Sequence, residues 1–369
     1  DSVQIVSTEQ FKDKFGLKAV QSGNWVLKDK ESIEFHVQRA AEAFVDMADV
    51  TGISPELLGF GGRLGLSFGA RGKGGALAHY EPVQRVINIT KMKGGGSLGH
   101  EYFHALDNII RDLMRQKNDG ESGYFATERP DSLPDGVIKQ AFQALQKALL
   151  VAPQAMTKIQ LDTRMRSELQ GMRLGKVLSA EMKMANIRTP IDVIDVLISS
   201  HVYTGVHKNQ PLSRHGTLAV LAGMREAGMI TGDETEVEVP MLWEVSQFKQ
   251  KAVLLDDGKP GKYWSQPLEM AARAYSAYLQ DRLAEQGRVN DYLAYSTQGG
   301  NSRVGEVAYP QGEERKAINA AFDRVFQAIK AEQVFEKAVQ NESLMDDLFG
   351  VGQLAETWID EEEGCYACL

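Results

Sequence analysis

The sequence predicts an α+β fold in which a small, mostly antiparallel sheet packs on one helix within a largely helical body. Three observations lead to this expectation. Two short β-rich runs, residues 76–81 and 85–90, are separated by a turn at Pro82. Apolar side chains recur at spacings of three and four over residues 98–113, as they do in an amphipathic helix. The same helical spacing dominates the chain after residue 118.

The N-terminal half, residues 1–118, is expected to hold the sheet. A long helix over about residues 30–50 would bury Ala40, Phe44 and Met47. The glycine-rich passage 59–75 lacks the GxxxxGKS/T pattern of a phosphate loop, so we expect strand and loop there. The two β-rich runs should form a hairpin whose second strand leads into the helix at 98–113.

The helix at 98–113 carries an HExxH motif made of His100, Glu101 and His104. One helical turn separates the two histidines, so both imidazoles leave the same face and can hold one tetrahedral Zn²⁺. Glu101 would lie beside the water on that metal and act as a general base. Ser97 is expected to cap the helix, directly after a run of three glycines. The spacing therefore predicts a zinc-dependent metallopeptidase.

A catalytic zinc ion needs a third protein ligand, and Glu269 is the expected one. It lies one turn into a second predicted helix, which Ser265 would cap and Pro267 would start. Asp107 is the alternative ligand. Its place close to His104 on the same helix better suits a carboxylate that accepts an imidazole proton and orients the ring.

The second helix also supplies candidates for catalysis. Arg273 follows Glu269 by one turn and could pair with it or bind a substrate carbonyl. Tyr275 or Tyr278 could donate a hydrogen bond to the oxyanion that forms during peptide hydrolysis.

The remaining chain divides into three expected parts. Residues 119–240 should form a helical insertion or lid, with helices at 134–150, 155–172, 178–186, 190–200 and 216–228. Residues 241–340 should form the C-terminal helical half that carries the third ligand, and residues 341–369 an acidic tail. This tail ends in CxxC, which is typical of a flexible terminus with exposed thiols. A second hypothesis is that Cys365 or Cys368 binds the catalytic zinc as a removable inhibitor.

Composition fits an enzyme of the cytosol, and the metallopeptidase motif makes a protein or peptide the expected substrate. The 369 residues carry a net charge of −9, which makes nucleic acid an unlikely partner. No apolar run is long enough to span a bilayer, and no disulfide framework is possible because both cysteines lie at the C-terminus. Oligomeric state does not follow from these features.

The motifs together resemble the large polyvalent protein-associated domain, type 1, over about residues 10–330. The segments that carry the resemblance are Phe15-Gly16, Gly23–Val26, Leu66–Gly72, Ala78–Pro82, Val86–Lys91, Gly96–Asn108 and Glu269–Tyr275. Such domains occur in long multidomain proteins of phages and conjugative elements. The resemblance implies a zincin-like metallopeptidase of the gluzincin arrangement, with His100, His104 and Glu269 on the metal and Glu101 as base. The helical insertion and the acidic tail depart from the family pattern.

Three classes of function remain open from the sequence. The first is a zinc endopeptidase that cleaves one specific protein, such as a host factor or the parent polyprotein of a mobile element. The second is a catalytically idle peptidase fold that has become a protein-binding module. The third is a DNA-associated factor of phage or conjugative transfer, for which a small basic cluster is the candidate surface: Arg63, Arg71, Lys73, Arg85, Lys91 and Lys93.

Overall fold

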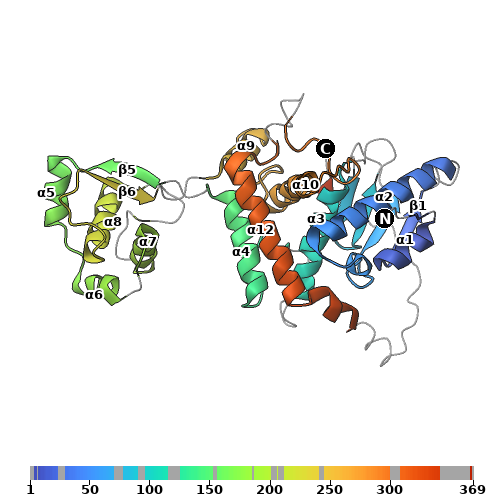
Figure 1. The fold of residues 1–369 in the computed structure, drawn as a ribbon, viewed down its shortest axis with the longest axis horizontal. Helices are drawn as coiled ribbons and strands as arrows, with labels where there is room; N and C mark the ends of the chain where they lie inside the picture. Colours follow the sequence, from blue (N-terminus) through green and yellow to red (C-terminus); the bar gives the residue numbers. More distant parts are fainter. Residues whose placement is uncertain are drawn as a thin grey trace. The chain divides into compact units, whose positions relative to one another are not determined.

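The fold was derived from a computed structural model, which describes residues 4–5, 7–23, 30–69, 78–89, 96–114, 125–152, 156–184, 187–200, 206, 212–240, 245–299, 308–340 and 366–367. The chain forms two compact units, one made of Asp1–Leu150 with Gln247–Leu369 and the other of Val151–Ser246 (Figure 1). The second unit therefore begins later than the insertion expected at residue 119. The reason is that helix α4 (Val137–Leu150) packs on α12 (Gly312–Ala331) of the first unit.

The sheet of the first unit is mixed rather than mostly antiparallel. Its strands are β1 (Ala19–Ser22), β2 (Gly65–Phe68), β3 (Ala78–Glu81), β4 (Val86–Ile89) and β7 (Tyr366–Ala367), in the order β1-β2-β4-β3-β7. The expected hairpin of β3 and β4 is confirmed, and β3 also pairs with β7 in an antiparallel manner. The pairs β1–β2 and β2–β4 are parallel. A helical crossover, α2 (Lys30–Thr51), separates β1 from β2 and permits the parallel pairing.

One face of this sheet packs on the HExxH helix, α3 (Leu98–Leu113). Leu66, Ile87 and Tyr80 lie in one register row, and all three are buried in the main core. The Tyr80 hydroxyl donates a hydrogen bond to Asn108 Oδ1 of α3 at 2.9 Å. The sheet thus fixes which face of α3 is turned towards it.

A second helix, α10 (Pro267–Glu285), packs along the other side of α3 (Figure 1). Phe103 of α3 contacts Tyr275 of α10 at 5.1 Å and Phe322 of α12 at 5.4 Å between ring centroids. Gly99 allows the close approach of the two helices: a Cβ at this position would lie 2.8 Å from Leu279 Cδ1. This packing places Glu269, in the first turn of α10, against the HExxH turn of α3.

Shorter elements complete the first unit. They are α1 (Thr8–Phe15), α9 (Gln247–Leu255) and two 3₁₀ turns, η1 (Pro55–Leu57) and η2 (Pro130–Ser132). Phe11, Phe15 and Phe44 form an aromatic cluster that joins α1 to α2.

The second unit has its own hydrophobic core and its own two-stranded sheet. Its elements are β5 (Met156–Gln160), α5 (Thr163–Gly171), α6 (Lys176–Met184), α7 (Pro190–Ser199), α8 (Arg214–Glu226) and β6 (Glu236–Pro240). The helix expected over residues 155–172 is wrong for its first part, because β5 pairs with β6 and Asp162 caps a helix that starts only at Thr163. In the described part of the chain, no helix combines the length and the apolar character that crossing a membrane requires.

Candidate metal centre

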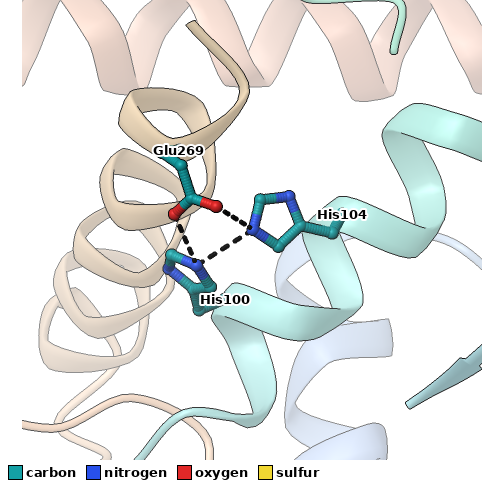
Figure 2. Close-up of side chains that lie close together, drawn as sticks. All are labelled: His100, His104 and Glu269. Atoms are coloured by element: carbon teal, nitrogen blue, oxygen red, sulfur yellow. Dashed lines mark hydrogen bonds and ion pairs between the residues drawn. The ribbon is translucent and has the colours of Figure 1, made fainter. Parts of the chain in front are cut away.

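The packing of α3 against α10 brings His100, His104 and Glu269 to one point (Figure 2). The Nε2 atoms of the two histidines lie 3.0 Å apart. His100 Nε2 lies 3.3 Å from Glu269 Oε2, and His104 Nε2 lies 3.4 Å from Glu269 Oε1. All three side chains are buried, with residue exposures of 6%, 1% and 1%. Two segments far apart in the sequence therefore share one polar site inside the core.

The three ligand atoms fit a single small divalent ion. Zinc bonds of about 2.0–2.1 Å in tetrahedral geometry separate two ligand atoms by roughly 3.3 Å. The three separations of 3.0, 3.3 and 3.4 Å are close to that value. Two imidazole nitrogens and one carboxylate form a donor set that zinc accepts in catalytic sites. The residues that the structure places together are those that the sequence nominated as ligands.

The charges in the centre favour an ionised carboxylate. Burial alone would raise the pKa of Glu269, but His104 and His100 beside it hold that pKa well below its usual value. Burial alone would lower the pKa of His104, yet Glu269, Glu101 and Asp107 together raise it. Glu269 and the His104 imidazole therefore stabilise each other's charged forms.

Glu101 lies in the first turn of α3 between the two histidines, and its exposure is 1%. It is close enough to His104 for its negative charge to raise the pKa of that imidazole. The HExxH helix thus holds a second buried carboxylate next to the site.

Asp107 does not bind the His104 ring directly in the described structure. Its Oδ1 accepts a hydrogen bond from the Thr127 backbone N–H at 2.8 Å, and its Oδ2 accepts one from the Thr127 hydroxyl. Phe125, two residues before Thr127, packs edge-on against the His104 ring at 5.9 Å between centroids. Asp107 therefore fixes the segment that covers His104. The sequence gives no signal for Thr127, because this contact joins residues from separate elements.

Arg273 supports the start of α10. Its guanidinium group lies over the rings of Trp264 at 4.9 Å and Phe248 at 5.5 Å. Its Nε donates to the Glu269 carbonyl oxygen at 3.2 Å, and its Nη2 donates to the Trp264 carbonyl oxygen. These contacts favour a structural role over the expected contact with a substrate.

A buried aspartate that the sequence did not single out shapes the same turn. Asp256 accepts hydrogen bonds from the backbone N–H groups of Tyr263, Trp264 and Ser265 at 3.0, 2.9 and 2.8 Å. It also accepts the Ser265 hydroxyl at 2.5 Å. Ser265 therefore does not cap α10 as expected; the N-cap is Gln266, and Pro267 begins the helix as predicted.

The two tyrosines expected at the oxyanion face the helical core. The Tyr278 hydroxyl donates to Asp323 Oδ1 of α12 at 3.0 Å. The Tyr275 ring is fully buried among Phe103, Phe322 and Phe326. Burial raises the pKa of Tyr275 well above its usual value, so its hydroxyl keeps its proton. These surroundings favour packing roles for both residues.

Other candidates from the sequence are only partly described. Arg85 pairs with Asp112 at 2.6 Å, and Arg63 donates to the Phe60 carbonyl oxygen at 2.9 Å. The other basic residues of that cluster lie outside the described residues, as do the two cysteines of the tail: Arg71, Lys73, Lys91, Lys93, Cys365 and Cys368. Ser97 precedes α3, but its side chain makes no capping hydrogen bond.

Comparison with known proteins identifies one part of the chain. Residues 255–333 match the family model described as large polyvalent protein-associated domain 1. This part of the chain contains Glu269 and the whole of α10 and α12, and here the match confirms the resemblance that the motifs carry. The HExxH helix lies outside the matched residues. No curated protein and no solved structure matches the chain.

Proposed function

We propose that this protein is a zinc-dependent metallopeptidase with a zincin-like arrangement of its site. The observation that carries the proposal is the meeting of His100, His104 and Glu269 within ligand distance of one another. A core built only for packing would hold apolar side chains at this point, because taking two imidazoles and a carboxylate out of water is costly.

Each residue has a distinct role in this proposal. His100, His104 and Glu269 would hold the ion, which acts as a Lewis acid: it lowers the pKa of water and polarises a peptide carbonyl. Glu101 takes the proton of the attacking water and delivers it to the leaving amine. Asp107 and Thr127 hold Phe125 against the His104 ring, so that its Nε2 atom keeps its direction.

A buried general base also favours a hydrolase over an idle binding module. Metal binding by the two histidines and Glu269 does not require a second carboxylate beside them. Glu101 nevertheless adds negative charge to a centre in which its own exposure is 1%. A module that only binds has no need of a carboxylate beside the metal, and proton transfer is the role that this position offers.

A matched pair of substitutions tests the proposal. Glu101→Gln keeps the shape and the ligands but removes the base, so we expect cleavage to fall by at least about a hundredfold while the zinc content stays at one per chain. Glu269→Ala should reduce zinc content and cleavage together. The measurements are metal analysis of the purified proteins and proteomic comparison of cells that express the wild type or Glu101→Gln.

Two results would contradict the proposal. One is an identical set of protein fragments in cells expressing the wild type and Glu101→Gln, with zinc bound in both. The other is a zinc content that Glu269→Ala leaves unchanged. The first result would favour a binding module, and the second would remove Glu269 from the centre.

A further inference from the structure

A cavity of about 850 Å³ lies between α2 and the loop that follows α10. The α2 wall runs from Phe35 to Asp46, and the loop wall runs from Arg288 to Tyr292. This volume is in the range of sites that hold a small ligand or a few residues of a peptide. The cavity is distinct from the metal centre, whose three ligands do not line it.

The loop wall is bonded to the N-terminal end of the metal helix. The Tyr292 carbonyl oxygen accepts the Gly96 N–H at 2.9 Å, and the Leu293 carbonyl oxygen accepts the Gly99 N–H at 2.9 Å. Gly99 directly precedes the ligand His100. The loop wall and the residue that follows it, Leu293, are therefore bonded directly to the start of the metal helix.

The cavity is formed before any ligand binds. The Asn290 side chain donates to Asp46 Oδ2 of α2 at 2.7 Å and accepts the Leu293 N–H at 3.0 Å. These bonds tie the loop wall to the helix wall. A site of this kind loses little conformational entropy on binding.

The charges of the lining disfavour a polyanionic ligand. Two guanidinium groups, Arg39 and Arg288, face three carboxylates, those of Glu42, Asp46 and Asp291. Arg39 pairs with Glu42 at 2.8 Å, and Arg288 pairs with Asp46 and with Asp49, the latter at 2.9 Å. A nucleotide or phosphate group would have to break these pairs and face an excess of negative charge.

The remaining surface combines apolar walls with hydrogen-bonding side chains. Phe35 on α2 is 56% exposed and Val289 on the loop is 79% exposed. His36 and Tyr292 also line the cavity, and His36 Nδ1 lies 3.1 Å from the Tyr292 hydroxyl. Burial raises the pKa of Tyr292, so its hydroxyl stays protonated and can bond to an amide. Apolar side chains flanked by amides are the chemistry of an uncharged peptide segment.

We propose that this cavity is an accessory site that binds an uncharged segment of the substrate polypeptide, with a large apolar side chain held between Phe35 and Val289. The choice of ligand rests on the proposed function, because a peptidase requires a polypeptide to pass close to its metal helix. The site would hold the substrate at a second point and so add to its affinity.

Photo-crosslinking tests this proposal directly. The probe is a capped, uncharged octapeptide with p-benzoylphenylalanine at its centre, added to the full, zinc-loaded chain with the Glu101→Gln substitution, which prevents turnover. Mass spectrometry should locate the crosslinks within residues 35–46 and 288–292. Phe35→Ala and Val289→Ser should each lower the yield by about fivefold or more, since each removes apolar contact area.

The chain offers a matched control. Leu254 on α9 is 71% exposed and does not line the cavity, so Leu254→Ser should leave the yield unchanged. Unchanged zinc content in all variants shows that each one folds. Crosslinks that map elsewhere, or a yield that neither Phe35→Ala nor Val289→Ser lowers, would overturn the proposal. Displacement of the probe by millimolar ATP would also overturn it.

The outcomes separate this inference from the proposed function. A chain that binds zinc and cleaves peptides without crosslinking at the cavity would lose the accessory site alone. A chain that crosslinks at the cavity but binds no zinc would support the peptide site and contradict the proposed peptidase function.

Discussion

Single side chains in the metal centre show how burial and charge are balanced. Glu269 and His104 offset each other: the carboxylate raises the pKa of the imidazole, and the imidazoles lower the pKa of the carboxylate. Asp107 has no such cationic partner at hydrogen-bond distance. Burial raises its pKa from the usual 3.8 to about 7, although Thr127 donates two hydrogen bonds to it.

This raised pKa predicts a pH-dependent contribution of Asp107 to stability. Between pH 3.8 and about 7 the folded chain holds a proton on Asp107 that the unfolded chain has lost. The stability that protonated Asp107 contributes is therefore fully present below pH 3.8 and is lost as pH rises through about 7. Asp107→Asn keeps the hydrogen-bonding shape but cannot ionise. Between pH 4 and 8, the free energy of unfolding of the wild type should fall by on the order of a few kcal/mol relative to that of Asp107→Asn.

Denaturant unfolding of the metal-free proteins at several pH values measures this difference. A constant gap between wild type and Asp107→Asn across the whole range would show that Asp107 ionises in the folded chain as it does in water. The comparison needs the metal-free form, because a divalent ion would change the charge next to His104.

The ligands could be predicted from the sequence because their signals are local. HExxH fixes the spacing of His100 and His104 within one helix, and Pro267 marks the start of the helix that carries Glu269. Thr127 and Asp256 could not be predicted, since their hydrogen-bond partners lie in other segments. Tyr275 and Tyr278 stand near Glu269 in the sequence, but the α10–α12 packing directs them into the core.

At the scale of elements, the closeness of α3 and α10 decides whether the three ligands meet. Gly99 is the residue that permits it, because a Cβ there would lie 2.8 Å from Leu279 Cδ1 and 3.0 Å from the Leu293 carbonyl oxygen. The first contact is with α10, and the second is with the loop that follows it.

Gly99→Ala should therefore push α3 away from α10. We expect the free energy of unfolding to fall by about 1–3 kcal/mol, the usual cost of overpacking. The zinc dissociation constant should rise, because Glu269 would move away from the two imidazoles. Thermal denaturation and a competition titration with a zinc chelator measure these two effects.

Gly171→Ala is the matched control. Gly171 ends α5, and a Cβ there would meet no atom within 4 Å. Alanine is the better helix former by roughly 0.5–1 kcal/mol, so this variant should be neutral or slightly stabilised and should bind zinc normally. Equal zinc affinity in Gly99→Ala and the wild type would contradict this prediction. It would mean that the distance between α3 and α10 does not set the geometry of the metal centre.

Elements were predictable where their pattern is local and were missed where pairing is distant. The periodicity of α3 and the short turn between β3 and β4 sufficed to predict both. The parallel pairing of β1, β2 and β4 depends on tertiary contacts that no local pattern encodes. The local pattern predicts helix at Met156–Gln160, because the strand that pairs with this segment, Glu236–Pro240, lies far along the chain.

At the scale of the whole molecule, the two compact units have separate cores. All three candidate ligands belong to the first unit. The second unit is continuous in sequence, and an antiparallel bridge joins Val151 to Val245 near its two ends. These features describe a domain inserted into the chain of another.

Removal of the second unit should therefore leave the metal centre intact. A chain in which a short Gly-Ser linker replaces residues 152–244 should fold and bind one zinc ion, because Val151 and Val245 are already adjacent. Circular dichroism and metal analysis check this outcome. A deletion variant that stays folded but loses zinc would show that the second unit contributes to the site.

The central claim is that His100, His104 and Glu269 bind one zinc ion together. X-ray absorption spectroscopy of the zinc-loaded chain tests it most directly. We expect one zinc per chain, a shell of nitrogen and oxygen ligands at about 2.0–2.1 Å, and the scattering pattern of two imidazoles. A shell at about 2.3 Å, which indicates cysteine sulfur, or the absence of imidazole scattering would contradict it.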